Sequence, residues 1–267
     1  MKKYQDRVCC FIDILGFKEI INRTISNDKK GSQKEIRSII KALEMARSIT
    51  SMDEPRFIPK SKKVTQFSDS IVISFEATDK EQVVSTLIEI LLICMNFLMS
   101  GYLLRGGISI GKLIHTNKYL FGPAIIAAYE LETNAALFPR IILGEQILNI
   151  LDEPVEIYES STDVQWVKDN LVSKDTDDMY YIDYISKFES EVDDITEAQM
   201  YISKLREIII ELGKSQKPSL IVKYGWLKNK FNSYIHKMKT DRAHIEELKE
   251  QGEIEIVNYI LGMTKIP

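Results

Sequence analysis

The strongest constraint on the fold is an apolar run that ends in a single carboxylate. Residues 8–12 are five consecutive apolar side chains, VCCFI, and they predict a strand that is buried on both faces. Asp13 follows this strand directly. Because an unpaired carboxylate is costly to bury, an acid in this position usually meets a cation, a metal ion or helix amides.

The residues after Asp13 narrow these choices to two. Residues 15–17, LGF, predict a tight turn, and a helical pattern begins at residue 17. The first amides of a helix lack intrahelical partners and point to where an anion can bind. A carboxylate beside such amides is typical of a metal–phosphate site. The competing interpretation is a buried Asp13 that caps the following helix, and this segment alone leaves both open.

Composition and charge exclude several classes of protein. With 267 residues, 45% of them hydrophobic, the chain can bury one large core with an appendage. The net charge of −4 argues against nonspecific nucleic-acid binding. Cys9, Cys10 and Cys94 lie in apolar runs without C-x-x-C spacing, so we expect reduced core residues of a cytoplasmic protein. Residues 83–99 are too interrupted for a membrane span and predict a buried helix instead.

The order of the expected elements predicts the fold class. Strands are expected at 8–12, 64–75 as a hairpin, 103–111 with a second arm at 113–116, 138–143 and 179–185. Helices are expected to about residue 24, from a cap at Ser32, over 80–99, from residue 122, and from about 195 to the end with breaks at Gly213 and Pro218. This order favours an α+β sandwich of the ferredoxin-like or palm type with helices on one face of the sheet. We expect a catalytic domain at 1–187 and a C-terminal helical extension at 188–267.

A second carboxylate interrupts the predicted hairpin. In a palm-type sheet the first strand and this hairpin are neighbours, so Asp13 and Asp69 are expected side by side. Two adjacent carboxylates repel each other, and a divalent cation such as Mg²⁺ or Mn²⁺ is the usual remedy. Arg105 is the only charge in a glycine-rich strand, whose glycines indicate a close approach to the backbone. Arg105 is expected either to hold a phosphate or to neutralise an aspartate.

Several sequence blocks together resemble the class III nucleotidyl cyclases. The general blocks are 11–17 (FIDILGF), 67–70 (FSDS) and 104–111 (LRGGISIG). Further blocks resemble the pyrimidine cyclases of Pycsar anti-phage systems, namely 121–124 (FGPA), 128–132 (AYELE), 138–141 (FPRI) and 223–227 (KYGWL). The resemblance covers residues 8–187 well and the helical tail more loosely.

The resemblance implies a class III cyclase fold and a two-metal site. It implies that two Mg²⁺ or Mn²⁺ ions are held by Asp13, Asp69 and the carbonyl of Ile14. The phosphates would be bound by the amides of Leu15, Gly16 and Phe17 and by the side chain of Arg105.

The chain departs from the purine cyclases at the places that stabilise the transition state. The family's Asn and Arg positions hold Ile126 and Glu130 here. We expect Arg140 to supply the missing cation, and Lys174 is a weaker candidate for a contact from the partner subunit. His115 and His236 are expected at the surface.

The places that read a purine base hold Thr65 and Tyr119. A hydroxyl and a phenol suit a smaller ring, which favours UTP as the substrate and cyclic UMP as the product. Family cyclases are homodimers with sites at the interface, and a separate effector protein senses the cyclic nucleotide. No membrane or nucleic-acid partner is expected.

Four alternatives stay open beside the uridylate cyclase. They are a cytidylate cyclase, a purine cyclase, a catalytically inactive dimerisation module, and a diguanylate cyclase. The last of these lacks its Gly-Gly-Asp/Glu-Glu-Phe turn, because residues 67–70 are FSDS.

Overall fold

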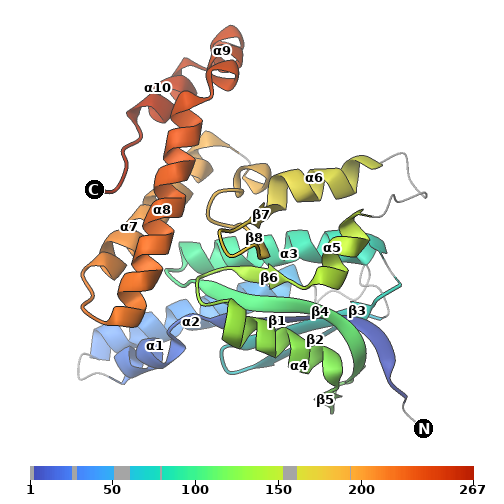
Figure 1. Cartoon of the computed structure of the whole chain (residues 1–267). Helices are drawn as coiled ribbons and strands as arrows, with labels where there is room; N and C mark the ends of the chain where they lie inside the picture. Colours follow the sequence, from blue (N-terminus) through green and yellow to red (C-terminus); the bar gives the residue numbers. More distant parts are fainter. Residues whose placement is uncertain (1–2, 26–28, 51–60, 79, 153–160, 193) are drawn as a thin grey trace. The chain divides into compact units, whose positions relative to one another are not determined.

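The structure is a computed structural model that describes residues 3–25, 29–50, 61–78, 80–152, 161–192 and 194–267. The chain divides into two compact units, Met1–Lys187 and Phe188–Pro267. The first unit holds the sheet, and the second is built from helices (Figure 1).

The first unit is built on one eight-stranded mixed sheet. Its strands are β1 (Gln5–Ile14), β2 (Lys63–Phe67), β3 (Ser70–Glu76), β4 (Leu104–His115), β5 (Leu120–Phe121), β6 (Ile141–Leu143), β7 (Val172–Lys174) and β8 (Tyr180–Ile182). The strand order is β2-β3-β1-β4-β6-β8-β7, and β5 pairs with the end of β4. The first four strands lie in the order β2-β3-β1-β4 with each antiparallel to its neighbours, which is the ferredoxin-like arrangement. The predicted α+β fold class is therefore confirmed.

Helices cover both faces of the sheet in the first unit. They are α1 (Phe17–Thr24), α2 (Lys29–Ile49), α3 (Lys80–Met99), α4 (Pro123–Glu130), the π-helix η1 (Leu131–Ala135), α5 (Glu145–Asp152) and α6 (Ser161–Leu171). The expectation of helices on one face was wrong, because α4 packs on the face opposite α3 (Figure 1). A central strand that is apolar on both faces needs such a second cover.

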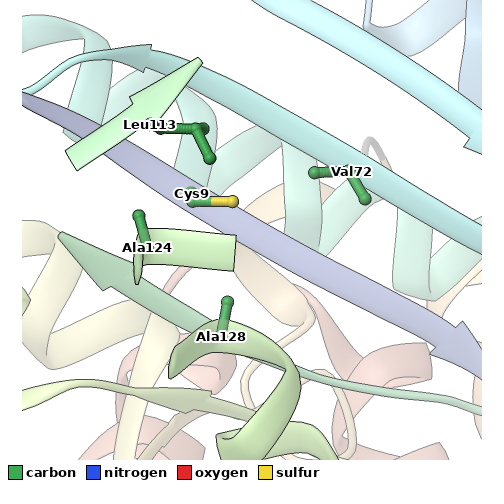
Figure 2. Close-up of a cluster of buried hydrophobic side chains, with 5 residues drawn as sticks. All are labelled: Cys9, Val72, Leu113, Ala124 and Ala128. Carbon is green, nitrogen blue, oxygen red and sulfur yellow. The ribbon is translucent and has the colours of Figure 1, made fainter. Parts of the chain in front are cut away.

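The predicted buried strand is the centre of this packing. Figure 2 shows Cys9 of β1 in contact with Val72, Leu113, Ala124 and Ala128, which come from β3, β4 and α4. The alternate side chains Val8, Cys10 and Ile12 are buried on the other face. All three cysteines are free and buried, as predicted.

The glycines of β4 admit close packing, as their number predicted. A Cβ atom added at Gly107 would lie 2.5 Å from the carbonyl oxygen of Ala128 and 2.5 Å from the Cβ of Leu131. The approaching group is therefore the backbone of α4 and η1. The predicted break near residue 112 was wrong, because β4 is one continuous strand that pairs with β1 along ten residues.

Two further predictions concern helices α2 and α3. Helix α2 begins at Lys29, so Ser32 lies inside it and does not cap it; its hydroxyl instead points to the carbonyl of Arg23 at 3.5 Å. Residues Gln82–Met99 of α3 are long and apolar enough to cross a membrane, and 61% of this window is buried inside the structure. The predicted buried helix is confirmed.

The second unit is helical, as predicted. Its helices are η2 (Glu189–Glu191), α7 (Ile195–Gly213), α8 (Pro218–Thr240), α9 (Arg242–Glu250) and α10 (Ile254–Gly262). Asp194 caps α7 by accepting a hydrogen bond from the Glu197 amide. Phe188 stacks on Tyr201 with ring centroids 4.3 Å apart. The predicted breaks at Gly213 and Pro218 coincide with the end of α7 and the start of α8.

Candidate active site

The structure brings Asp13 and Asp69 together. Asp13 lies next to the end of β1, and Asp69 lies with Ser68 in the two-residue turn between β2 and β3. Ser68 adopts the left-handed region with φ of 55°, which closes this tight turn. The two carboxyl groups are close enough for each charge to act on the other, and Asp13 accepts a hydrogen bond from the Ser70 hydroxyl at 3.3 Å.

The surroundings of Asp13 disfavour its charge. Burial, the largest cause, together with the neighbouring charges of Asp69 and Glu132 raises the pKa of Asp13 from 3.8 to about 6, while Arg105 opposes them. Asp13, Asp69 and Glu132 bring three carboxyl groups close to one cation, Arg105, so the site lacks positive charge. A bound cation would supply it.

Arg105 lies between two carboxylates. It is directly opposite Asp13 in the pairing of β1 with β4. Its Nη2 atom is 3.7 Å from Asp13 Oδ2 but only 2.6 Å from Glu132 Oε1. Its Nε atom is buried and has no hydrogen-bond partner among the residues that the structure describes. Arg105 is thus held mainly by Glu132 and keeps one unused donor.

Glu132 is the site residue that the sequence did not reveal. Its side chain is only 3% exposed, although glutamate is rarely buried. It lies on the π-helix η1, four residues after Ala128 and eight after Ala124, which are the buried residues of α4. Regular helical spacing therefore places Glu132 on the buried face, and what the sequence does not show is its partner, Arg105 on β4. A π-helix is frequent at functional sites, but no residue pattern announces it here.

The burial of Glu132 predicts a measurable cost for removing its charge. Glu132→Gln is expected to lower the free energy of unfolding by about 1–3 kcal/mol, because it leaves Arg105 without its principal partner. Urea denaturation measures this loss. Glu130→Gln, on the exposed end of α4, is the matched control and is expected to stay within about 0.5 kcal/mol of the wild type. Equal stability of the two variants would contradict a structural ion pair.

Some of the backbone amides that were predicted to bind phosphate make hydrogen bonds within the protein. The Leu15 amide, predicted to bind phosphate, donates to the carbonyl of Leu103 at 2.8 Å in this structure. Helix α1 begins at Phe17 after Gly16, which has φ of 78° and supplies no side-chain cap. The Glu19 amide in the first turn of α1 donates to the Gly16 carbonyl at 3.0 Å, and phosphate binding by the amides of Gly16 and Phe17 stays a prediction.

The predicted base-reading residues lie on β2 and in the β4–β5 connection. Thr65 is half-buried and its hydroxyl contacts His115 Nε2 at 2.8 Å. Tyr119 is 56% exposed. The surface position expected for His115 was wrong, because strand β4 continues to residue 115 and buries the imidazole; His236 is exposed as predicted.

Arg140 is enclosed by carboxylates of its own. The side chain is 1% exposed, and its Nη1 atom lies 2.7 Å from Asp175 and 3.0 Å from Asp177. The structure places no contact between Arg140 and either Asp13 or Asp69 among the described residues. Lys174, the weaker candidate, is exposed and pairs with Asp178 at 2.7 Å.

The side chains at the two positions where the chain departs from the purine cyclases, Ile126 and Glu130, also lie away from Asp13 and Asp69. Ile126 is 58% exposed on α4. Glu130 lines a pocket of about 430 Å³ together with residues of β4 and α5. Neither Asp13 nor Asp69 lines that pocket.

The donor atoms near Asp13 fit a hard divalent cation. Two carboxylates and backbone carbonyl oxygens are the ligands that Mg²⁺ and Mn²⁺ prefer. Burial and, after it, the charges of Asp69 and Glu132 raise the pKa of Asp13, and a bound cation would oppose both effects. No group of three metal-ligating side chains occurs in the described ranges, so phosphate oxygens or water would complete the coordination.

Comparisons with known proteins add the following findings. No protein-family model matches the chain, and no curated protein sequence is significantly similar to it. Its structure is similar to the crystal structure of a class III adenylyl cyclase-like ATP-binding protein from Pseudomonas aeruginosa, with a TM-score of 0.41 and 13% sequence identity. The match covers 80% of this chain and 46% of that chain, so this chain spans less than half the length of that protein.

Proposed function

We propose that residues 1–187 form a nucleotidyl cyclase that converts UTP into cyclic UMP and pyrophosphate. The observation that carries the proposal is the meeting of Asp13 and Asp69 beside the uncapped N-terminus of α1, with Arg105 opposite Asp13. A cation site next to a helix N-terminus suits a nucleoside triphosphate, whose phosphates bind both.

The reaction asks for positioning and charge neutralisation. The ribose 3′-oxygen loses its proton to water and forms a bond to the α-phosphorus, while the bond from that phosphorus to the bridging oxygen breaks and pyrophosphate leaves. Two Mg²⁺ or Mn²⁺ ions bound by Asp13, Asp69 and the Ile14 carbonyl would supply Lewis-acid stabilisation of the oxygens. The α1 amides and the partly exposed guanidinium of Arg105 would bind the phosphate oxygens.

Thr65 and Tyr119 favour a pyrimidine over a purine. Tyr119 stands where a purine reader carries an acid, and a phenol shortens the pocket. We therefore propose UTP as the main substrate, with a cytidylate cyclase as the alternative. By its resemblance to pyrimidine cyclases of anti-phage systems, the cyclic nucleotide would act on a separate effector in the cytoplasm.

Exposed apolar side chains support a homodimer. Phe67 at the β2–β3 turn is 81% exposed, and Ile126 and Tyr129 on α4 are 58% and 51% exposed. Phe67 adjoins the Asp69 turn, and Tyr129 contacts Phe11 in β1 two residues before Asp13. A partner that covers these side chains would complete the site at the interface.

Assembly is testable by dilution and by substitution. Ile126→Glu and Tyr129→Glu are expected to shift the protein toward monomer and to lower specific activity about tenfold or more, because a buried charge opposes association. Analytical ultracentrifugation measures the shift. Ile40→Glu, on the exposed face of α2, is the matched control and should change neither quantity. A wild type that is active and monomeric at all concentrations would contradict the dimer.

One experiment tests the function directly. The purified protein is incubated with Mn²⁺ and each of the four ribonucleoside triphosphates, and products are identified by mass. Cyclic UMP is expected as the main product, with cyclic CMP as the principal side product. Dominant cyclic AMP or cyclic GMP would overturn the pyrimidine assignment, and the absence of every cyclic product would overturn the cyclase.

A second candidate is a catalytically inactive dimerisation module. It is favoured by the pairing of Arg105 with Glu132 and of Arg140 with Asp175 and Asp177, which engages both candidate cations. The same incubation distinguishes it, because an inactive module yields a dimer and no product.

A further inference from the structure

A chain of hydrogen bonds runs from a buried cation to Thr65. Arg7 Nε lies 3.0 Å from Ser74 Oγ, Ser74 Oγ lies 2.8 Å from His115 Nδ1, and His115 Nε2 lies 2.8 Å from Thr65 Oγ1. Arg7, Ser74 and His115 are all buried, whereas Thr65 is half-buried. We call these four residues the Arg7 relay.

The cation at one end sets the direction of every proton in the relay. A guanidinium only donates, so Ser74 Oγ accepts from Arg7. Within the described part of the chain, the Ser74 hydroxyl has no acceptor other than His115 Nδ1, so its single proton points there. Nδ1 is therefore the acceptor nitrogen of the imidazole, and Nε2 carries the hydrogen and donates to Thr65.

The opposite direction is disfavoured. If His115 Nδ1 donated to Ser74, the serine oxygen would accept twice and its buried proton would have no partner. A doubly protonated imidazole is also disfavoured, because burial and the charges of Arg7 and Lys63 lower the pKa of His115 to about 4. The imidazole is thus neutral at pH 7 and holds one tautomer.

The consequence falls on the hydroxyl of Thr65. Its oxygen accepts from His115, so its own proton is left to donate outward. Thr65 lies on the same face of the sheet as Asp13, because Thr65 pairs with Val72 and Val72 with Phe11, two residues from Asp13.

We propose that the Arg7 relay fixes Thr65 as a hydrogen-bond donor that selects a base with a carbonyl group over a base with an amino group at the same edge. The inference rests on the proposed function. Uracil presents the O4 acceptor there, whereas cytosine presents the N4 amine, which would oppose a donor. Arg7, Ser74 and His115 are positioning residues, and Thr65 is the group that touches the base.

The test measures the use of UTP relative to CTP. In an equal mixture with Mn²⁺, the wild type is expected to form cyclic UMP at least about tenfold faster than cyclic CMP. Thr65→Val removes the donor and should reduce this ratio about tenfold, and Ser74→Ala should reduce it in the same direction because His115 can then change tautomer. Ser109→Ala is the matched control, since Ser109 and Ser74 both pair with Cys9 and Ser109 donates outside the relay to the Ala124 carbonyl.

Two further readouts keep the inference separate from the activity. ¹⁵N NMR of the histidines, of which the chain has three, should show His115 neutral with the hydrogen on Nε2; a hydrogen on Nδ1 would overturn the inference. Calorimetry of UTP and CTP binding gives the same preference without turnover. Cyclic products with equal use of UTP and CTP overturn the inference alone, whereas tight, UTP-selective binding without any cyclic product overturns the cyclase and retains the donor role of Thr65.

Discussion

Asp13→Asn is expected to reduce cyclic nucleotide formation by at least about a thousandfold, and Asp69→Asn should do the same. Each substitution removes one of two carboxylates that would hold the cations, and with them the charge stabilisation of the transferred phosphorus. Product formation with Mn²⁺ measures the loss. Asp6→Asn, on the same strand but exposed and paired with Lys112, is the matched control and should keep full activity.

Asp13→Asn should also stabilise the metal-free protein. The pKa of Asp13 is about 6 in the folded chain and 3.8 ordinarily, so ionised Asp13 disfavours folding. This cost develops as pH rises from about 4 to about 6 and is complete above that range. Because the side chain is 18% exposed, solvent screening reduces the effect, and Asp13→Asn should gain about 1–2 kcal/mol at pH 7.

Measuring the free energy of unfolding of both proteins at several pH values checks this prediction. The difference in free energy of unfolding between Asp13→Asn and the wild type should vanish near pH 4 and shrink when Mg²⁺ is added at pH 7. An active Asp13→Asn protein, or one that is less stable than the wild type at pH 7, would contradict the cation site.

The meeting of Asp13 and Asp69 was predictable because it depends on topology. An apolar strand followed by a hairpin in a ferredoxin-like order places the end of the first strand beside the hairpin turn, whatever the side chains do elsewhere. The first strand and the hairpin are both visible in the sequence as apolar runs, and their order along the chain was enough for this expectation.

The surroundings of Glu132, His115 and Arg140 were not predictable, for different reasons. Glu132 continues the buried row of Ala124 and Ala128, but its partner Arg105 comes from β4 and no residue pattern in the helix shows it. His115 is buried because β4 runs on past the glycines that indicated its end. Arg140 meets Asp175 and Asp177 only because β8 folds back beside β6, and this pairing joins segments about forty residues apart. In each case the decisive information lies in a tertiary contact.

The environment of Arg140 leads to the largest expected effect on stability. Arg140→Met is expected to lower the free energy of unfolding of the first unit by about 3–5 kcal/mol, because it leaves the buried Asp175 carboxylate without its partner. The guanidinium also donates to the Ala135 carbonyl at 3.1 Å, so the end of η1, which carries Glu132, loses a contact. Thermal unfolding should shift by roughly 10 °C.

Two variants separate this structural role from the catalytic role that the sequence suggested for Arg140. Lys174→Met lies on the exposed part of the β7–β8 hairpin, next to Asp175. It should change the free energy of unfolding by less than about 0.5 kcal/mol. The double substitution Arg140→Met with Asp175→Asn should recover part of the loss, because it removes the uncompensated charge. An Arg140→Met protein with wild-type stability and no turnover would instead place Arg140 in the reaction, and the buried ion pairs would then have to open when the substrate binds.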